Sequence, residues 1–215
     1  MTQLAIARHD GQESARRHFD RWRRLYSRSR LLATLQEKAL AGLDLRSDDR
    51  LLDVACGAGK LVRAAEPRVE RAVGADLSPG MIEEANRRTG EASGAGSGIE
   101  FVVAPSDRLP FGDGEFTAVV TTTALHHFPD PAASAREMAR VLAPGGRILI
   151  GDSIRDTRPA RVGDAVLRRF ESGHVGLQDM HGIERLLAGA GVDVTRSERI
   201  WLGLYALVSG VKPAR

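Results

Sequence analysis

Five short runs of strand-like residues, separated by segments typical of helices and turns, constrain the fold of this chain most strongly. They span residues 51–55, 71–76, 99–103, 116–120 and 147–150. Strands that alternate with helices favour a parallel sheet covered by helices on both faces. Two more runs, residues 192–201 and 204–211, are joined around Gly203, which predicts an antiparallel hairpin at the sheet edge. We therefore expect a doubly wound α/β fold with a mostly parallel sheet.

The segments between these runs predict several helices. Ser78 is a good N-cap residue and Pro79 suits a first helical turn, so a helix is expected to begin there. Residues 131–142 and 179–188 predict two more helices. The segment 89–98 is rich in glycine, alanine and serine, which indicates a surface loop.

The first 45 residues differ from the rest in pattern and in charge. Apolar residues recur at helical spacing across residues 11–42, which predicts two helices, the second ending at Gly42. Eight arginines against three acidic residues give the first thirty positions a net charge of +5, whereas the whole chain carries +3. We expect residues 1–45 to form a helical cap on a second unit, residues 46–215.

Composition excludes several classes of function. Cys56 is the only cysteine, so an intrachain disulfide and a zinc site built from cysteines are excluded, and no metal is expected. Aromatic residues make up 5% of the chain, too few to favour base stacking, so a nucleic-acid partner is not expected. No apolar run reaches the roughly 18 residues of a membrane span. The apolar run that contains residues 4–6 is interrupted at Arg8, too early for the core of a signal peptide, so we expect no signal peptide and a cytoplasmic protein.

A glycine turn follows the first strand, at the edge where parallel α/β sheets bind ligands. Gly57 and Gly59 would allow a ligand to approach the backbone, and Asp76, about twenty residues later, could accept hydrogen bonds from two ribose hydroxyls. These residues predict an adenosine-containing cofactor. The third glycine of a dinucleotide fingerprint would fall at Val62, and Asp53 before the turn would repel a pyrophosphate but favour an amine. The pattern therefore favours S-adenosylmethionine.

At these residues the chain resembles the class I S-adenosylmethionine-dependent methyltransferases, particularly the small-molecule group of ubiquinone and menaquinone biosynthesis. The likeness runs from Leu51 to Pro213 and rests on five motifs in order, with a sixth fit at the end of the chain. They are residues 51–59, 73–81, 109–111, 124–131, 141–146 and 208–213. The resemblance implies a Rossmann-like sheet of seven strands, the last antiparallel. It also implies S-adenosylmethionine as cofactor and S-adenosylhomocysteine as product.

The resemblance implies the following roles. The methionine end would be held by Asp53 and the turn of Ala55, Cys56, Gly57 and Gly59. Asp76 would bind the ribose, with Leu77 and Met81 against the adenine. Thr122 would lie near the sulfur, and Tyr26 would reach the methionine carboxylate.

Two positions depart from the family pattern. Ala55 stands where the family usually has a glycine. Pro105 stands where an acidic residue often binds the adenine amino group, so Ser106 or Asp107 would have to replace that contact. We expect an altered cofactor affinity rather than its loss.

The chemistry itself needs little beyond positioning, because the leaving thioether is neutral. A base is needed only if the acceptor must lose a proton. His126 and His127 follow the fourth strand and are the candidate catalytic residues, although they could equally bond the backbone at the strand end.

We therefore expect a methyltransferase that acts on an O, N or C atom of a small organic acceptor, such as a secondary metabolite or a quinone-like compound. The basic N-terminal segment suggests an anionic acceptor. An S-adenosylmethionine-binding protein without methyl transfer remains an alternative, as does a nucleic-acid methyltransferase. The latter is disfavoured because the Asn/Asp-Pro-Pro-aromatic turn of base-amine methyltransferases is absent after residue 120. The sequence leaves a monomer and a homodimer equally open.

Overall fold

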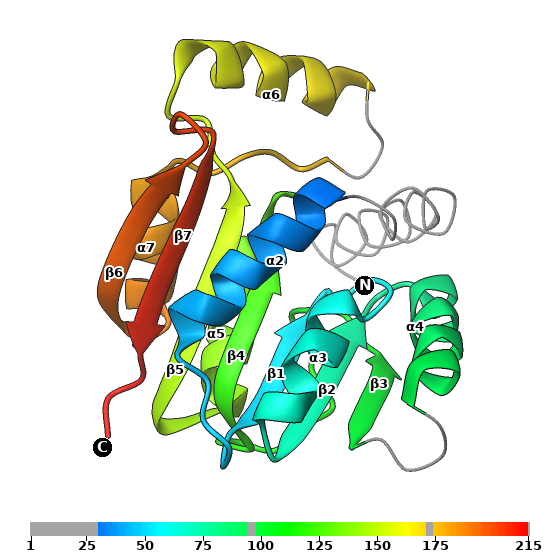
Figure 1. Ribbon diagram of the computed structural model, residues 1–215. Helices are drawn as coiled ribbons and strands as arrows, with labels where there is room; N and C mark the ends of the chain where they lie inside the picture. The colour runs from blue at the N-terminus through cyan, green and yellow to red at the C-terminus, as the bar shows by residue number, and fades with distance from the viewer. Residues whose placement is uncertain (1–29, 94–97, 171–173, 215) are drawn as a thin grey trace, which may run out of the picture.

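The computed structural model describes residues 30–93, 98–170 and 174–214, and its centre is one seven-stranded sheet (Figure 1). The strand order is β3-β2-β1-β4-β5-β7-β6. The strands are β1 (Arg50–Val54), β2 (Arg71–Asp76), β3 (Ile99–Val103), β4 (Phe116–Thr122), β5 (Leu142–Ser153), β6 (Asp193–Ile200) and β7 (Tyr205–Val211). Strands β1 to β5 run parallel, and β7 is antiparallel to both β5 and β6. The expected mostly parallel, Rossmann-like sheet of seven strands is confirmed.

Helices cover both faces of this sheet (Figure 1). They are α2 (Arg30–Leu43), α3 (Lys60–Ala65), α4 (Pro79–Ser93), α5 (Pro131–Val141), α6 (Arg158–Phe170) and α7 (Met180–Gly189), with short 3-10 turns at Glu66–Arg68 and Leu125–His127. One apolar core joins the sheet to α5 and α7 through Met138, Ile183 and Leu187. A second core joins the opposite face to α2 and α3 through Leu40 and Leu61. Burial on both faces explains why the central strands are almost entirely apolar.

Some sequence predictions need correction. Helix α4 continues to Ser93, so residues 89–93 are helical where a loop was expected. Strand β5 begins at Leu142 and ends at Ser153, well beyond residues 147–150. Helix α6 was not predicted at all. The hairpin is present, but β6 alone forms the edge, because β7 pairs with β5 on its other side.

The structure describes only the second part of the predicted N-terminal helical cap. Helix α2 is the second of the two expected helices, and it ends at Leu43 rather than Gly42. Leu35, Leu40 and Leu43 of α2 are buried against the sheet. The first expected helix lies outside the described residues, as do Tyr26 and the arginine cluster. The division at residue 45 stays a prediction.

The carboxyl ends of β1 to β5 meet at one edge of the sheet, and α6 lies beyond that edge at the top of Figure 1. None of the helices that the structure describes is long and apolar enough to span a membrane.

Candidate cofactor and acceptor site

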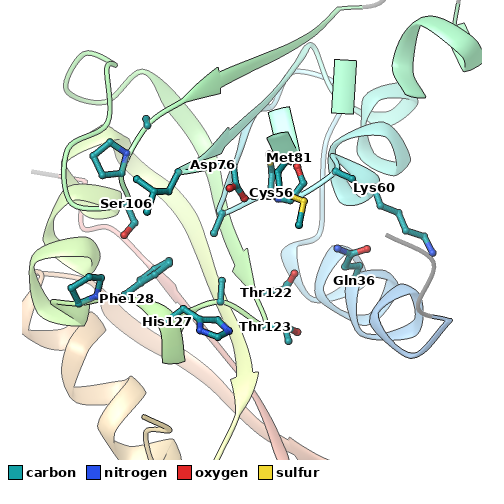
Figure 2. A pocket seen from close by; sticks show the side chains of 18 of the residues that line it. Gln36, Cys56, Lys60, Asp76, Met81, Ser106, Thr122, Thr123, His127 and Phe128 are labelled. Carbon is teal, nitrogen blue, oxygen red and sulfur yellow. Dashed lines mark hydrogen bonds between the residues drawn. The ribbon is translucent and has the colours of Figure 1, made fainter. Parts of the chain in front are cut away.

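A hollow of about 1110 Å³, part of it open to solvent, lies at the carboxyl ends of the parallel strands. The turn after β1, the ends of β2 and β4, the segment after β3 and the 3-10 turn after β4 all contribute to its wall. The lining residues are Gln36, Ala55, Cys56, Gly57, Ala58, Lys60, Asp76, Leu77, Met81, Arg88, Ala104, Pro105, Ser106, Thr122, Thr123, Ala124, His127, Phe128 and Pro129. Figure 2 shows Asp76, Met81, Thr122 and His127 facing it from different elements.

The turn between β1 and α3 is built from left-handed residues. Ala55, Gly57 and Gly59 have φ angles of 61°, 54° and 70°. The turn is held by hydrogen bonds from the Cys56 amide to the carbonyl of Ala75 (3.0 Å) and from the Gly59 amide to the carbonyl of Cys56 (3.0 Å). Three left-handed residues in five bend the chain sharply, so that the backbone of residues 55–58 faces the hollow.

Asp76 lies at the end of β2 and lines the same hollow. Its Oδ2 accepts a hydrogen bond from the amide of Gly57 (2.8 Å), and its Oδ1 accepts one from the amide of Ser78 (2.9 Å). A carboxylate oxygen can accept more than one hydrogen bond. The two backbone amides therefore fix the carboxylate in an orientation where a ligand's hydroxyl groups can also reach it.

Asp53 was expected to hold the methionine end, but it does not line the hollow. It lies within β1, where it is fully buried, and its Oδ1 has no hydrogen-bond partner among the described residues. Burial raises the pKa of its carboxyl well above the usual range, and the neighbouring Asp76 carboxylate raises it further. Asp53 therefore sits beneath the turn as a carboxyl group whose negative charge would be stabilised by a nearby cation.

An apolar wall lies beside Asp76. Leu77, Met81, Ala104 and Pro105 line it, and Ser106 joins them with its hydroxyl 2.8 Å from that of Ser134. Such a wall suits a flat heterocycle. Of the two residues expected to replace the missing acidic contact, Ser106 lines the hollow and Asp107 does not.

The other residues predicted to bind the cofactor also divide into those that line the hollow and those that do not. Cys56 and Thr122 line the hollow as expected, whereas Gly59 does not. Gly59 instead lies against the ring of Phe101, which a Cβ would approach to 2.4 Å. Burial raises the pKa of the Cys56 thiol well above its usual range, and both nearby carboxylates add to the shift, so Cys56 is a packing residue rather than a nucleophile.

Three lining residues with an amide or a charged side chain were missed by the sequence analysis. Gln36 of α2, Lys60 at the start of α3 and Arg88 of α4 all border the hollow. The Oε1 atom of Gln36 is buried and has no hydrogen-bond partner among the described residues. Such an atom costs free energy unless a bound donor satisfies it. Only Lys60 had a local signal, because it directly follows the glycine turn.

The two candidate catalytic histidines occupy different positions. His127 lines the hollow, while His126 does not. The Nδ1 atom of His126 lies 2.7 Å from Oδ1 of Asp152, and its backbone amide donates to Oδ2 of the same carboxylate (2.9 Å). The ring centroids of His126 and His127 are 4.0 Å apart, and the ring centroid of His174 is 6.1 Å from that of His127. Asp152 therefore anchors His126, whose ring lies against the tilted ring of His127 at the hollow.

Thr123, next to the predicted Thr122, adds a strained position to the wall. Its φ of 54° is unusual for a β-branched residue. Its amide donates to the carbonyl of Gly151 (2.7 Å), and its hydroxyl lies 3.0 Å from that of Tyr205. Tyr205 is buried, and burial raises the pKa of its phenol, so it stays neutral. Strain of this kind is often retained at ligand sites.

Among the residues that the structure describes, no group of three or more His, Cys, Asp or Glu side chains is arranged to hold a metal ion.

Comparison with known proteins identifies the family. A family model described as a methyltransferase domain matches residues 52–150. The demethylmenaquinone methyltransferase of Clavibacter sepedonicus is 30% identical over 187 residues, which cover 77% of this chain and 74% of that protein. The chain belongs to the class I S-adenosylmethionine-dependent methyltransferases.

The chain is also similar to two further methyltransferases. The 27-O-demethylrifamycin SV methyltransferase of Amycolatopsis mediterranei is 34% identical over 178 residues, covering 78% of this chain and 65% of that protein. A methyltransferase solved in complex with the Trm112 activator of Haloferax volcanii has a TM-score of 0.81 at 21% identity, and the match covers 94% of this chain and 98% of that one. The chain spans between 39% and 65% of the length of four curated relatives that it matches.

The hollow of this methyltransferase fits S-adenosylmethionine by its donor set. Asp76 offers a fixed carboxylate for ribose hydroxyls, and the apolar wall suits an adenine. Two buried oxygens without described partners, on Asp53 and Gln36, match a ligand that carries an ammonium group. The pyrophosphate of a dinucleotide would instead bring negative charge toward the carboxyl group of Asp53.

The contact between Gly59 and Phe101 predicts a large effect on stability. Gly59→Ala should lower the free energy of unfolding by about 2–4 kcal/mol, because it combines a left-handed alanine with a clash against the Phe101 ring. Gly57→Ala is the matched control: its φ is also positive, but a Cβ there meets no atom within 4 Å, so a loss of only about 1 kcal/mol is expected. Urea denaturation measures both, and equal losses would contradict the proposed clash.

The departure at Ala55 predicts the opposite effect. Ala55→Gly should stabilise the methyltransferase by about 0.5–1 kcal/mol, because relief of the left-handed strain exceeds the entropy cost of glycine. Ala58→Gly in the same turn is the control, since Ala58 has no left-handed strain to relieve and should lose stability. Thermal melting distinguishes them, and a lower melting temperature for Ala55→Gly would show that the strain is not there.

Proposed function

We propose that this protein transfers the methyl group of S-adenosylmethionine to a small organic acceptor. The observation that carries the proposal is the Asp76 carboxylate, which two backbone amides hold at the edge of a hollow lined by the glycine turn and an apolar wall. This arrangement supports recognition of an adenosine, and family membership supports methyl transfer.

The roles of the residues follow from their chemistry. Asp76 would accept hydrogen bonds from the ribose hydroxyls, and Leu77 and Met81 would pack on the adenine. Asp53 would stabilise the ammonium group from beneath the turn, and Gln36 would accept a hydrogen bond from it. Ser106 would contact the adenine edge in place of the acidic residue that Pro105 replaces. Tyr26 lies outside the described residues, so its contact with the carboxylate remains part of the proposal.

The bound cofactor supplies an electrophilic methyl group on a sulfonium. The chain's own contribution is to exclude water, orient the acceptor and remove a proton where the acceptor carries one. His127 is placed for that last step because its side chain lines the hollow from the turn after β4. His126, bonded to Asp152, acts as a positioning residue.

The acceptor class is proposed from the wall and from the relatives. Apolar atoms predominate in the hollow, which favours a largely apolar acceptor. Two of the relatives are named as methyltransferases of a demethylrifamycin and of demethylmenaquinone. We therefore propose a secondary metabolite or a quinone-like compound, in agreement with the sequence prediction. Lys60 and Arg88 at the hollow also support an anionic group on the acceptor or recognition of the cofactor's carboxylate.

Methyl transfer is tested directly with S-adenosylmethionine that carries a radiolabelled methyl group. The enzyme is incubated with a panel of hydroxylated aromatic compounds, naphthoquinols and macrolide alcohols. We expect label in an organic extract with at least one class, and production of S-adenosylhomocysteine that depends on the acceptor. Binding of the cofactor with no transfer to any class would favour the alternative of a cofactor-binding protein without methyl transfer.

A further inference from the structure

Among the residues of α6 whose exposure is described, only the acid Asp164 is buried. Asp164 is 4% exposed, and its Oδ1 bonds Nε2 of His174 (2.8 Å) and the amide of Leu177 (2.8 Å). In contrast, Val162 and Val166 are 65% and 51% exposed, and Leu167 is also exposed. A helix on a globular protein normally turns its apolar stripe toward the core. The orientation of α6 instead leaves its valines and Leu167 open at the surface.

Exposed leucines also lie on the turn between β6 and β7, which approaches the start of α6. Leu202 is 97% exposed, and Leu204 is also exposed. The carbonyl of Leu204 accepts a hydrogen bond from the amide of Ile154, four residues before α6 (3.0 Å), and Figure 1 shows this turn beside the start of the helix. The exposed surface therefore comprises Val162, Val166, Leu167, Leu202 and Leu204, and we call it the α6 surface.

The conformation of the turn keeps Leu202 at the surface. Trp201, Leu202 and Gly203 have consecutive φ angles of 52°, 56° and 80°. Each left-handed residue other than glycine costs about 1–2 kcal/mol. A turn that retains this cost while exposing a leucine almost completely indicates that the leucine has a use outside the folded chain.

The charge around α6 identifies the kind of partner. Four arginines lie on this one helix, against the single acid Asp164, which is buried and paired. Arg158 and Arg169 are exposed, whereas Arg161 and Arg168 line a second hollow together with Arg155, Asp164 and Asp179, and Arg168 is paired with Asp164 there. An apolar stripe flanked by arginines on a short helix is the composition of helices that lie in a membrane interface. With 13 residues, α6 is too short to cross the bilayer.

We propose that the α6 surface docks this protein on an anionic lipid bilayer, with the valines and Leu202 among the acyl chains and the arginines at the lipid headgroups. The segment after α6 joins this surface to the active-site wall, because the amides of Val175 and Gly176 donate to the carbonyl of His126 (2.8 and 3.2 Å). Docking is independent of the proposed function. Delivery of a lipophilic acceptor from the bilayer to the active site would rest on the proposed function.

Co-sedimentation of the full chain with vesicles tests the docking. We expect binding to phosphatidylcholine vesicles that contain phosphatidylglycerol, and at least tenfold weaker binding to phosphatidylcholine alone, with the difference reduced by salt. The double variant Val162→Glu/Val166→Glu should lose at least tenfold in vesicle affinity. Arg158→Gln and Arg169→Gln should each lose about fivefold.

Val103→Glu is the matched control. Val103 is 51% exposed, as Val166 is, but it lies on β3 at the opposite edge of the sheet, so its replacement should leave vesicle binding unchanged. Circular dichroism melting confirms that each variant is folded. Failure of the wild type to bind anionic vesicles would overturn the proposal, as would an equal loss in Val103→Glu. A wild-type dimer in light scattering that only the double variant dissociates, without lipid binding, would instead assign the surface to a second copy.

Discussion

Replacing Asp76 by alanine is expected to weaken the binding of S-adenosylhomocysteine by at least about a hundredfold. The variant would remove the two hydrogen bonds proposed between ribose hydroxyls and this charged acceptor, and bonds of this kind contribute about 1.5–3 kcal/mol each. It also releases the amides of Gly57 and Ser78 that orient the carboxylate. Isothermal titration calorimetry measures the change in dissociation constant.

Two further variants separate a specific loss from a general one. Asp76→Asn keeps the side-chain shape and should still lose most of the affinity, because the amide lacks the charge and one acceptor oxygen. Asp107→Ala removes a nearby carboxylate that does not line the hollow, so it should bind within about twofold of the wild type. If Asp76→Ala binds the ligand normally, the assignment of the ribose site is wrong.

Replacing His127 by asparagine is expected to lower kcat by about 10²- to 10⁴-fold for an acceptor that must lose a proton, the usual contribution of a general base. Binding of S-adenosylhomocysteine should change little, because the expected cofactor contacts come from other elements. The wild-type rate should also fall at acidic pH, since an imidazole must be neutral to take a proton, and the variant should lack that fall. Steady-state kinetics across a pH series measures both effects.

The matched control is His181→Asn. His181 lies on α7, where its Nδ1 is 2.7 Å from Glu184, and it does not border the hollow. It should leave kcat and its pH profile unchanged. Asp152→Asn should reduce kcat less than His127→Asn does, because it only loosens the anchored His126. If His127→Asn left kcat unchanged, His127 would not act as a general base, and positioning of the acceptor alone would account for the rate.

Several of the residues that line the hollow could be predicted from the sequence because they follow strand ends. In the register of β1 and β2, Val54 pairs with Ala75, so the turn after β1 and Asp76 must meet. Asp53 lies one pair earlier within the strand, so it is buried beneath the turn instead of lining the hollow, and its role toward the cofactor stays a prediction. The contributions of Gln36 and Arg88 could not be predicted, since both reach the hollow through the packing of helices distant in sequence.

Elements with local signals were also predicted better than elements that depend on their surroundings. Asp130 and Pro131 begin α5 as a capping residue and a first-turn proline, and that helix was expected. The small residues of 89–93 suggested a loop, yet α4 continues through them. Helix α6 was not predicted although Val162 and Val166 recur at helical spacing; that these valines face solvent while Asp164 is buried could not be predicted, because it depends on the packing of the helix.

The most direct test of the central claim is a calorimetric titration of the wild-type protein with S-adenosylmethionine and S-adenosylhomocysteine. The hollow at the carboxyl edge of the sheet predicts one binding site per chain for each ligand, with affinity that depends on Asp76. Absence of binding heat for both ligands, at several temperatures and with a folded protein, would contradict the account.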